Sequence, residues 1–349
     1  MSNLERDPVE LRCHAEGAGA AIEVLRPRDV PLGGPRAMPV RRTLPQRGRT
    51  TIGAWCFADH YGPDDVAETG GMVVPPHPHT GLQTVSWLFQ GEIEHRDSTG
   101  SHALVRPGAV NLMTAGHGIS HSEVSTPTTT TLHGVQLWVA LPDGSRDVAP
   151  FFEHAEVGEA TVDDAVVRVF VGTLPGLDDE AAVTVFTPLV AAQIDLPAGG
   201  EAWIELEPGF EHGILVDRGP VQLAIAATED EDPGAMVGGD PLAVAGHTAT
   251  LERAELGYLP PRHEGVRLRA DAEPARVVLL GGTPFGEELV MWWNFIGRSH
   301  EEVAEFRRQW QSEVIGRDNP DGRFGTVADY PGEALPAPEL PTVRLKPRS

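Results

Sequence analysis

Two histidines separated by one proline, His77 and His79, precede a run of residues that is typical of a β-strand. In an extended chain, residues i and i+2 face the same side, so these two imidazoles point to one place. Pro78 favours this extended conformation in the residue before it. Forty-two residues after His79, the sequence His121-Ser-Glu123 has the same spacing. We therefore expect two facing strands that each direct two polar side chains into a common site.

Three neutral imidazoles and one carboxylate are a ligand set for a divalent metal ion. Mixed nitrogen and oxygen ligation without thiolate suits Fe(II), Mn, Ni, Cu(II) or Zn. With four protein ligands, an octahedral ion keeps two adjacent positions for water, substrate or O2, as in the two-histidine-one-carboxylate oxygenases. A closed tetrahedral zinc site with a structural role is the alternative that the same residues leave open.

The other histidines of this region are expected to have structural roles. His95 and His102 lie in or beside strands at a parity that predicts exposed or hydrogen-bonded rings. His117 lies in a glycine-rich loop close to the site, and His133 opens a strand. His60 is expected in a turn near the site entrance.

The elements that must position these side chains are short antiparallel strands. Glycine and proline, with 39 and 31 residues, make up about a fifth of the 349-residue chain and indicate many turns. In the first long strand, Val85, Trp87 and Phe89 face one way and Thr84 and Ser86 face the other. Repeated strands of this kind predict an all-β fold, either an antiparallel barrel or a sandwich.

A second β-rich half repeats this rhythm from about residue 189, which indicates an internal duplication. In this half, His212 takes the place that the histidine pair has in the first half. Near the end of the chain, Ser299 and Glu302 form a capping-box pattern that predicts the start of a helix.

These patterns divide the chain into five expected parts. They are a flexible N-terminal tail at 1–20, a metal-binding domain at 21–150, a linker at 151–180, a second β domain without a metal site at 181–317, and an extended C-terminal tail at 318–349.

The formal net charge of −24 argues against direct contact with nucleic acid or an anionic membrane, because both are bound through basic patches. Two cysteines cannot form a disulfide framework, so a reducing, cytoplasmic compartment is expected. The N-terminal residues lack the apolar core of a signal peptide, and no run approaches the length of a membrane span.

The segment "HPHTGLQTVSWLFQGEIEHRDSTGSHALVRPGAVNLMTAGHGISHSE" resembles the metal-binding domain of pirin, a two-domain member of the cupin superfamily. The stretches "RRTLP" (41–45) and "GAWCFADHYGP" (53–63) resemble the part that precedes the family's first ligand pair. The resemblance is close over residues 21–145 and looser over 175–300. It implies a bicupin, with two tandem antiparallel cupin β-barrels of which the first holds one metal ion.

Carried over residue by residue, the resemblance implies that His77, His79, His121 and Glu123 are the metal ligands. The family's metal is usually iron, and its members show quercetin 2,3-dioxygenase activity. This reaction opens the central ring of a flavonol with O2 and releases carbon monoxide. By analogy, Glu123 would act catalytically by taking the proton of the substrate's 3-hydroxyl group. The implied partners are a small phenolic substrate and O2.

The resemblance also implies an alternative function, because some pirins are regulators that bind a partner protein and use iron as a redox sensor. Two positions depart from the family pattern. Gln83 stands where the common cupin motif has a glutamate, so the carboxylate must come from Glu123. The second half has only His212 and no HxE partner.

Overall fold

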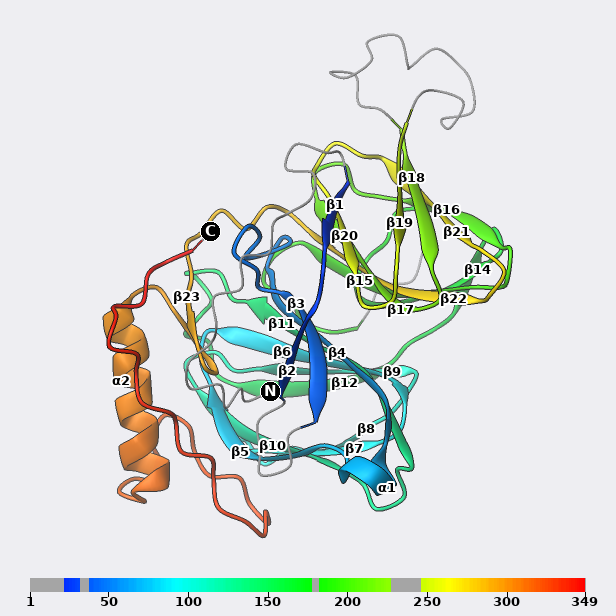
Figure 1. Ribbon diagram of the computed structural model, residues 1–349. Helices are drawn as coiled ribbons and strands as arrows, with labels where there is room; N and C mark the ends of the chain where they lie inside the picture. Colours follow the sequence, from blue (N-terminus) through cyan, green and yellow to red (C-terminus); the bar gives the residue numbers. More distant parts are fainter. Residues whose placement is uncertain (1–21, 32–37, 178–181, 227–245, 349) are drawn as a thin grey trace.

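The computed structural model describes residues 22–31, 38–177, 182–226 and 246–348. The expected N-terminal tail, residues 1–20, lies outside the described residues. The described chain forms two β lobes and a C-terminal segment with one long helix that lies beside the first lobe (Figure 1). No helix in this part of the chain has the length and apolar character needed to cross a membrane.

The first lobe consists of two antiparallel sheets that lie across from each other (Figure 1). A short helix, α1 (Val66–Thr69), follows one of its long strands. The strands of the seven-stranded sheet are, in spatial order, β12 (Phe151–Glu156), β9 (Ala109–Thr114), β6 (Leu82–Gln90), β11 (Thr131–Ala140), β4 (Trp55–Asp65), β3 (Pro39–Leu44) and β2 (Arg28–Pro31). Those of the four-stranded sheet are β5 (Val73–His79), β10 (Ile119–Ser125), β7 (Ile93–Asp97) and β8 (His102–Val105).

The second lobe repeats this plan. The strands of its seven-stranded sheet are β1 (Glu23–Leu25), β20 (Leu256–Leu259), β17 (Glu211–Arg218), β22 (Ala275–Gly282), β15 (Leu189–Leu196), β14 (Ala165–Gly172) and β13 (Ala160–Val162). Those of its four-stranded sheet are β16 (Glu201–Glu205), β21 (Gly265–Ala270), β18 (Val221–Ile225) and β19 (His247–Leu251).

The predicted all-β fold with two antiparallel lobes is confirmed, and the two strand orders correspond element for element. The correspondence corrects the placement of one histidine. Strand β16 takes the place of β5, the strand that carries the histidine pair, but His212 lies in β17, which takes the place of β6. The comparison of the two halves of the sequence assigned His212 to the wrong strand, because equal spacing of turns does not determine which strands pair.

The expected linker at 151–180 contains three strands: β12 pairs with β9 in the first lobe, whereas β13 and β14 belong to the second. The predicted linker is therefore wrong, because these residues complete both sheets. One strand lies apart from the rest of its lobe: β1, at the start of the chain, pairs with β20 in the second lobe. This pairing has no local sequence signal, since β1 and β20 are far apart in sequence.

An apolar core joins the lobes through the faces of the two seven-stranded sheets. Val85 and Trp87 of β6 pack in one cluster with Phe170, Leu215 and other residues of the second lobe. The Trp87 and Phe170 rings are stacked, with centroids 4.5 Å apart. The apolar face predicted for β6 therefore contacts the other lobe, and its polar face lines the interior of the first lobe.

The C-terminal segment begins with a hairpin of β23 (Val290–Trp292) and β24 (Phe295–Gly297), followed by α2 (His300–Trp310) and a π-helical turn at Gln311–Ile315. The predicted N-cap is confirmed, because the Ser299 hydroxyl accepts a hydrogen bond from the Glu302 N–H. The expected tail after residue 317 runs without further strands or helices along α2 and the first lobe (Figure 1).

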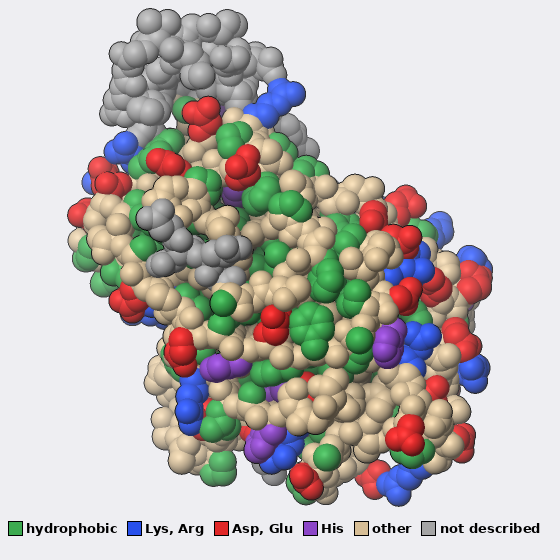
Figure 2. Space-filling model, turned by 180° about the vertical axis from the view of Figure 1, so that it is seen from behind, with side chains coloured by type: hydrophobic (Ala, Val, Ile, Leu, Met, Phe, Trp, Pro, Cys, Tyr) green, Lys and Arg blue, Asp and Glu red, His purple; other side chains and the backbone are tan. Residues whose placement is uncertain are grey.

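Acidic side chains are spread over both lobes on the face seen in Figure 2, as expected for a chain of net charge −24. Several arginines are paired with them, for example Arg276 with Asp195 and Arg298 with Glu287.

Candidate metal centre

The structure brings the three predicted histidines together inside the first lobe. His77 and His79 lie at the end of β5, and His121 lies on β10 directly opposite His77. The ring centroids of the three pairs are 4.4, 5.0 and 5.1 Å apart, and all three side chains are fully buried. Their ligand nitrogens lie within 4.8 Å of one another, so the three residues form a group that could hold a metal ion.

Each imidazole has one engaged nitrogen and one unpaired nitrogen. The Nδ1 atoms of His77 and His79 donate to the carbonyl oxygens of Pro75 and Asn294, at 2.9 and 3.1 Å. The Nδ1 of His121 lies 3.4 Å from the Nδ1 of His95. The three Nε2 atoms are buried and have no hydrogen-bond partner. Buried polar atoms are rarely left unpaired, so three bare nitrogens that face one place fit a metal ion.

Glu123 lies on the same strand as His121 but is not part of the compact group of three histidines. A break in register between His121 and Glu123 shifts the pairing of β10 with β5, so that Glu123 lies opposite Val74. Its Oε2 atom is also buried without a hydrogen-bond partner. The chemistry of this donor set, three imidazoles and one carboxylate, fits Fe(II) and similar divalent ions.

Burial sets the protonation state of the three histidines. It lowers the pKa of His77, His79 and His121 well below their usual value, because the charged imidazolium would be cut off from water. For His121, repulsion from His77 and His79 lowers the pKa further. All three rings are thus neutral at pH 7, the form that binds a metal ion.

Sequence reasoning missed two residues beside His121. His95 and Asp97 of β7 are buried, and the His95 ring stacks on Phe152 with centroids 4.4 Å apart. His95 lies opposite Glu123 and Asp97 lies opposite His121. The predicted hydrogen-bonded ring of His95 is confirmed, but its contact with His121 was not predicted. The i, i+2 spacing of His95 and Asp97 was the available signal. His102, for which the sequence also predicted an exposed or hydrogen-bonded ring, is exposed and pairs with Glu94, as predicted.

Other buried polar groups of the first lobe also lack a hydrogen-bond partner among the described residues. They include the Tyr61 hydroxyl, the Gln136 amide nitrogen and the Trp138 indole nitrogen. The Trp138 ring meets His79 edge to face, with centroids 5.1 Å apart. Burial raises the pKa of Tyr61, and the charges of Glu123 and Asp59 raise it further, so the hydroxyl keeps its proton. These groups are available to hydrogen-bond a ligand.

A second histidine cluster lies between the lobes. His60 of β4 and His133 of β11 both approach Asp217 Oδ1 of β17, at 2.6 and 2.5 Å. The expected turn at His60 is therefore wrong, because this residue lies within a strand. Arg41 Nε donates to His60 Nδ1 at 3.2 Å, so His60 must carry its proton on Nε2 and donate it to Asp217. Both nitrogens of His60 are thus engaged in hydrogen bonds, and the contacts of His60 and His133 with Asp217 hold the lobes together.

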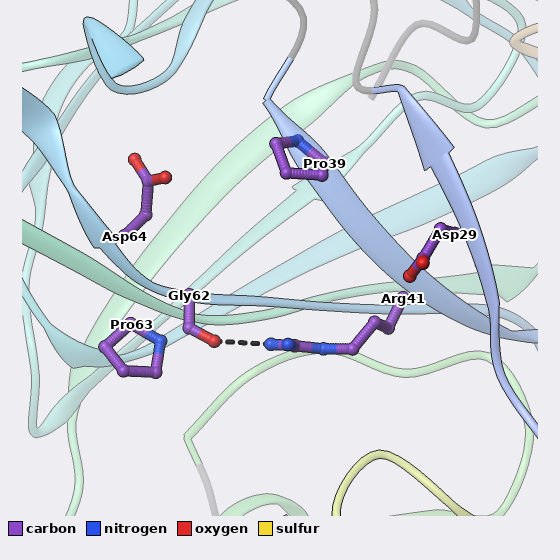
Figure 3. A pocket seen from close by; sticks show the side chains of 6 residues that line it. All are labelled: Asp29, Pro39, Arg41, Gly62, Pro63 and Asp64. Carbon is purple, nitrogen blue, oxygen red and sulfur yellow. Dashed lines mark hydrogen bonds between the residues drawn. The ribbon is translucent and has the colours of Figure 1, made fainter. Parts of the chain in front are cut away.

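Arg41 also lines a pocket of about 120 Å³ on the outer side of this cluster. Figure 3 shows its guanidinium directed at the carbonyl oxygen of Gly62, and Asp29 and Asp64 also line the pocket. None of the predicted metal ligands lines this pocket, which is therefore separate from the metal centre.

Comparison with known proteins agrees with this architecture. The Pirin family model matches residues 37–139, and the model of the Pirin C-terminal cupin domain matches residues 191–316. A Pseudomonas aeruginosa protein provisionally named quercetin 2,3-dioxygenase is 40% identical over 344 residues, covering 98% of each chain. A pirin-like protein of Caulobacter vibrioides is 33% identical over 86% of this chain and 94% of its own.

Solved structures show the same fold. A quercetin 2,3-dioxygenase from Acinetobacter baumannii superimposes with a TM-score of 0.78 at 35% identity, covering 93% of this chain and 97% of its own. A bacterial pirin from Escherichia coli, solved in complex with nickel(II), matches in fold with a TM-score of 0.53 at 17% identity. That protein is covered to 99% but covers only 75% of this chain. From both family models and these relatives, the chain belongs to the pirin family, and its two lobes are cupin domains.

Proposed function

We propose that this chain is a metal-dependent dioxygenase of the quercetin 2,3-dioxygenase type, which cleaves a flavonol or a similar phenolic with O2. The observation that carries the proposal is the set of four buried, unpaired ligand atoms: the Nε2 atoms of His77, His79 and His121, and Oε2 of Glu123. The names of the Pseudomonas and Acinetobacter relatives support the reaction class.

Under this proposal, the three histidines and Glu123 hold one divalent ion, with Fe(II) the best match to the donor set. When bound, the ion supplies Lewis acidity and a redox-active centre for the reaction between the phenolic and O2. Glu123 accepts the proton of the substrate's hydroxyl group, since its free oxygen is the carboxylate atom nearest to the histidines along β10.

The unpaired interior groups orient the substrate. The Tyr61 hydroxyl and the Trp138 indole N–H can donate to oxygen atoms of a phenolic, and the Gln136 amide offers a third donor. Groups that are left unpaired in the absence of ligand favour a substrate that satisfies them over one that does not. The complete burial of the histidines favours turnover inside the lobe over redox sensing at the surface.

The test is to purify the protein without oxygen, measure its metal content and load separate samples with Fe(II), Mn, Ni, Cu and Zn. Each sample then receives quercetin and O2, and carbon monoxide and the depside product are quantified. Both products in equal amounts support the proposal. If no metal form releases carbon monoxide from quercetin or related phenolics, while a protein partner binds only one oxidation state of iron, the regulatory alternative replaces it.

A further inference from the structure

The side chain of Asp97 has two oxygens with separate partners. Oδ1 accepts three hydrogen bonds, from the Thr99 N–H at 2.8 Å, the Thr99 hydroxyl at 2.6 Å and the Ser101 N–H at 3.1 Å. Oδ2 faces Nε2 of His95 at 3.2 Å. The carboxylate is buried, and the turn at 97–101 fixes its orientation because that turn needs an acceptor at Oδ1.

These contacts determine which nitrogen of His95 carries the proton. A carboxylate only accepts hydrogen bonds, so His95 Nε2 must be the donor. In the neutral ring, Nδ1 of His95 is then an acceptor, and the nitrogen that faces it is Nδ1 of His121, 3.4 Å away. His121 therefore carries its proton on Nδ1, which leaves its Nε2 bare toward the metal site.

We propose that His95 and Asp97 are positioning residues that hold His121 in the tautomer required for metal binding. The inference rests on the proposed metal centre. It adds that the tautomer of His121 depends on that of His95, which depends in turn on Asp97. His77 and His79 donate to backbone carbonyl oxygens, which remain hydrogen-bond acceptors whatever side chain is substituted. His121 is different, because its partner is another imidazole whose polarity is set in turn by Asp97. The stacking of His95 on Phe152 holds this ring in place.

Because Asp97 sets the tautomers of His95 and His121, the Asp97→Asn variant should reverse both tautomers. The three donors at 99–101 require the amide oxygen, so the amide N–H2 group turns toward His95. His95 then accepts on Nε2 and donates from Nδ1, and His121 must accept on its own Nδ1. The proton of His121 moves to Nε2 and blocks the metal position, although neither residue 95 nor residue 121 has been changed.

A matched substitution separates this effect from loss of packing. In His95→Asn, the amide oxygen takes the place of the ring Nδ1 and still accepts from His121, but the side chain no longer reaches Asp97. We expect this variant to lose clearly less metal affinity than Asp97→Asn, because His121 keeps an acceptor at its Nδ1. The double variant Asp97→Asn/His95→Asn should then match His95→Asn, a non-additive result that a purely structural role of Asp97 would not produce.

Two measurements test the proposal in the full-length protein. Nitrogen-15 NMR of the histidine side chains in metal-free protein reports the tautomer of His121, and competition with a chelator gives the Ni(II) affinity. The expected results are an Nδ1–H tautomer in the wild type, an Nε2–H tautomer in Asp97→Asn, and an affinity that is about 10- to 100-fold weaker in that variant.

An Nε2–H tautomer in the wild type overturns the proposal without reference to any variant. Equal loss of affinity in Asp97→Asn and in the double variant overturns it as well. If the wild type shows the expected tautomer but binds no metal ion, the positioning chain stands and the proposed function fails.

Discussion

The three histidines of the centre obtain the same tautomer from three different sources. His77 donates to a carbonyl two residues away, His79 to a carbonyl in the C-terminal hairpin, and His121 to another side chain. Because each ring is oriented in the metal-free protein, the proposed metal site would be preorganised for binding.

The proposed role of Glu123 is testable by Glu123→Gln, which keeps the size of the side chain and removes its charge. We expect flavonol turnover to fall by about 100-fold or more, since the variant lacks a proton acceptor. The three imidazoles should still retain metal, which elemental analysis would show. The exposed Glu156→Gln is the control and should leave turnover unchanged. Unchanged turnover in Glu123→Gln would remove Glu123 from the reaction.

The hydroxyl of Tyr61 is suited to a test that separates binding from stability. Because it is buried and unpaired, Tyr61→Phe removes an unsatisfied group, and thermal unfolding should show equal or greater stability. If the hydroxyl binds substrate, KM for the phenolic should rise several-fold in the same variant. A large loss of stability would mean that the hydroxyl has a partner in the folded protein.

The i, i+2 rule indicated the two candidate ligand pairs in the sequence because it depends only on local strand geometry. The same rule applies to His95 and Asp97, but their role depends on the register between β7 and β10. The partner of His79 was also beyond local reasoning, since Asn294 is 215 residues away. Local geometry thus predicted that the three histidines lie together, and it could not predict the groups that orient them.

At the scale of elements, the hairpin β23–β24 docks directly on the end of β5. Thr80 forms a parallel bridge with Phe295, and the Ile296 N–H donates to the Thr80 carbonyl at 3.2 Å. The turn after β5 allows this approach because Gly81 has a φ of +67° and a Cβ there would lie 2.7 Å from the Ile296 carbonyl oxygen.

This contact predicts the effect of Gly81→Ala. The new methyl group displaces the hairpin and places alanine in a left-handed conformation, so we expect a loss of about 1–3 kcal/mol in the free energy of unfolding. Metal affinity should fall as well, because the hairpin carries the carbonyl that orients His79. Gly144→Ala is the matched control, since a Cβ at Gly144 meets nothing within 4 Å. Normal metal affinity in a destabilised Gly81→Ala would show that the hairpin does not support the centre.

At the scale of the whole molecule, the two lobes share an apolar core, and the first strand of the chain, β1, belongs to the second lobe, so the lobes should unfold together. Trp87 is fully buried, stacks on Phe170 and donates from its indole nitrogen to Gln193 at 2.8 Å. Trp87→Ala should cost about 3–5 kcal/mol and destabilise both lobes in one transition, as seen by tryptophan fluorescence and circular dichroism. Two separate transitions in the wild type would contradict this expectation.

Buried neutral histidines also make the stability depend on pH. Burial, with repulsion from His263, lowers the pKa of His212 from 6.5 to about 4, and burial lowers that of His60 to about 4. Between pH 6.5 and 4 the unfolded chain therefore binds more protons than the folded one. The free energy of unfolding must fall as the pH falls through this range.

His212→Leu should reduce this pH slope by up to about 1.4 kcal/mol per pH unit, because one of the buried rings no longer takes up a proton on unfolding. Stability near pH 7 should not suffer, since both ring nitrogens of His212 are buried without a partner. Urea unfolding at several pH values measures both quantities, and the same substitution at the exposed His102 is the control. An unchanged slope in His212→Leu would mean that this ring is already charged in the folded protein.

The docking of the C-terminal hairpin on the metal-binding lobe has a consequence for biosynthesis. A chain emerges from the ribosome N-terminal end first, so β5 and β10 are available long before residue 294 is made. Until then His79 lacks the carbonyl that orients it. In the same way, β1 has no partner until β20 of the second lobe is made. The candidate metal site of the first lobe is therefore fully assembled only after residue 294 has been synthesised, so the proposed metal ion would find its complete site only then.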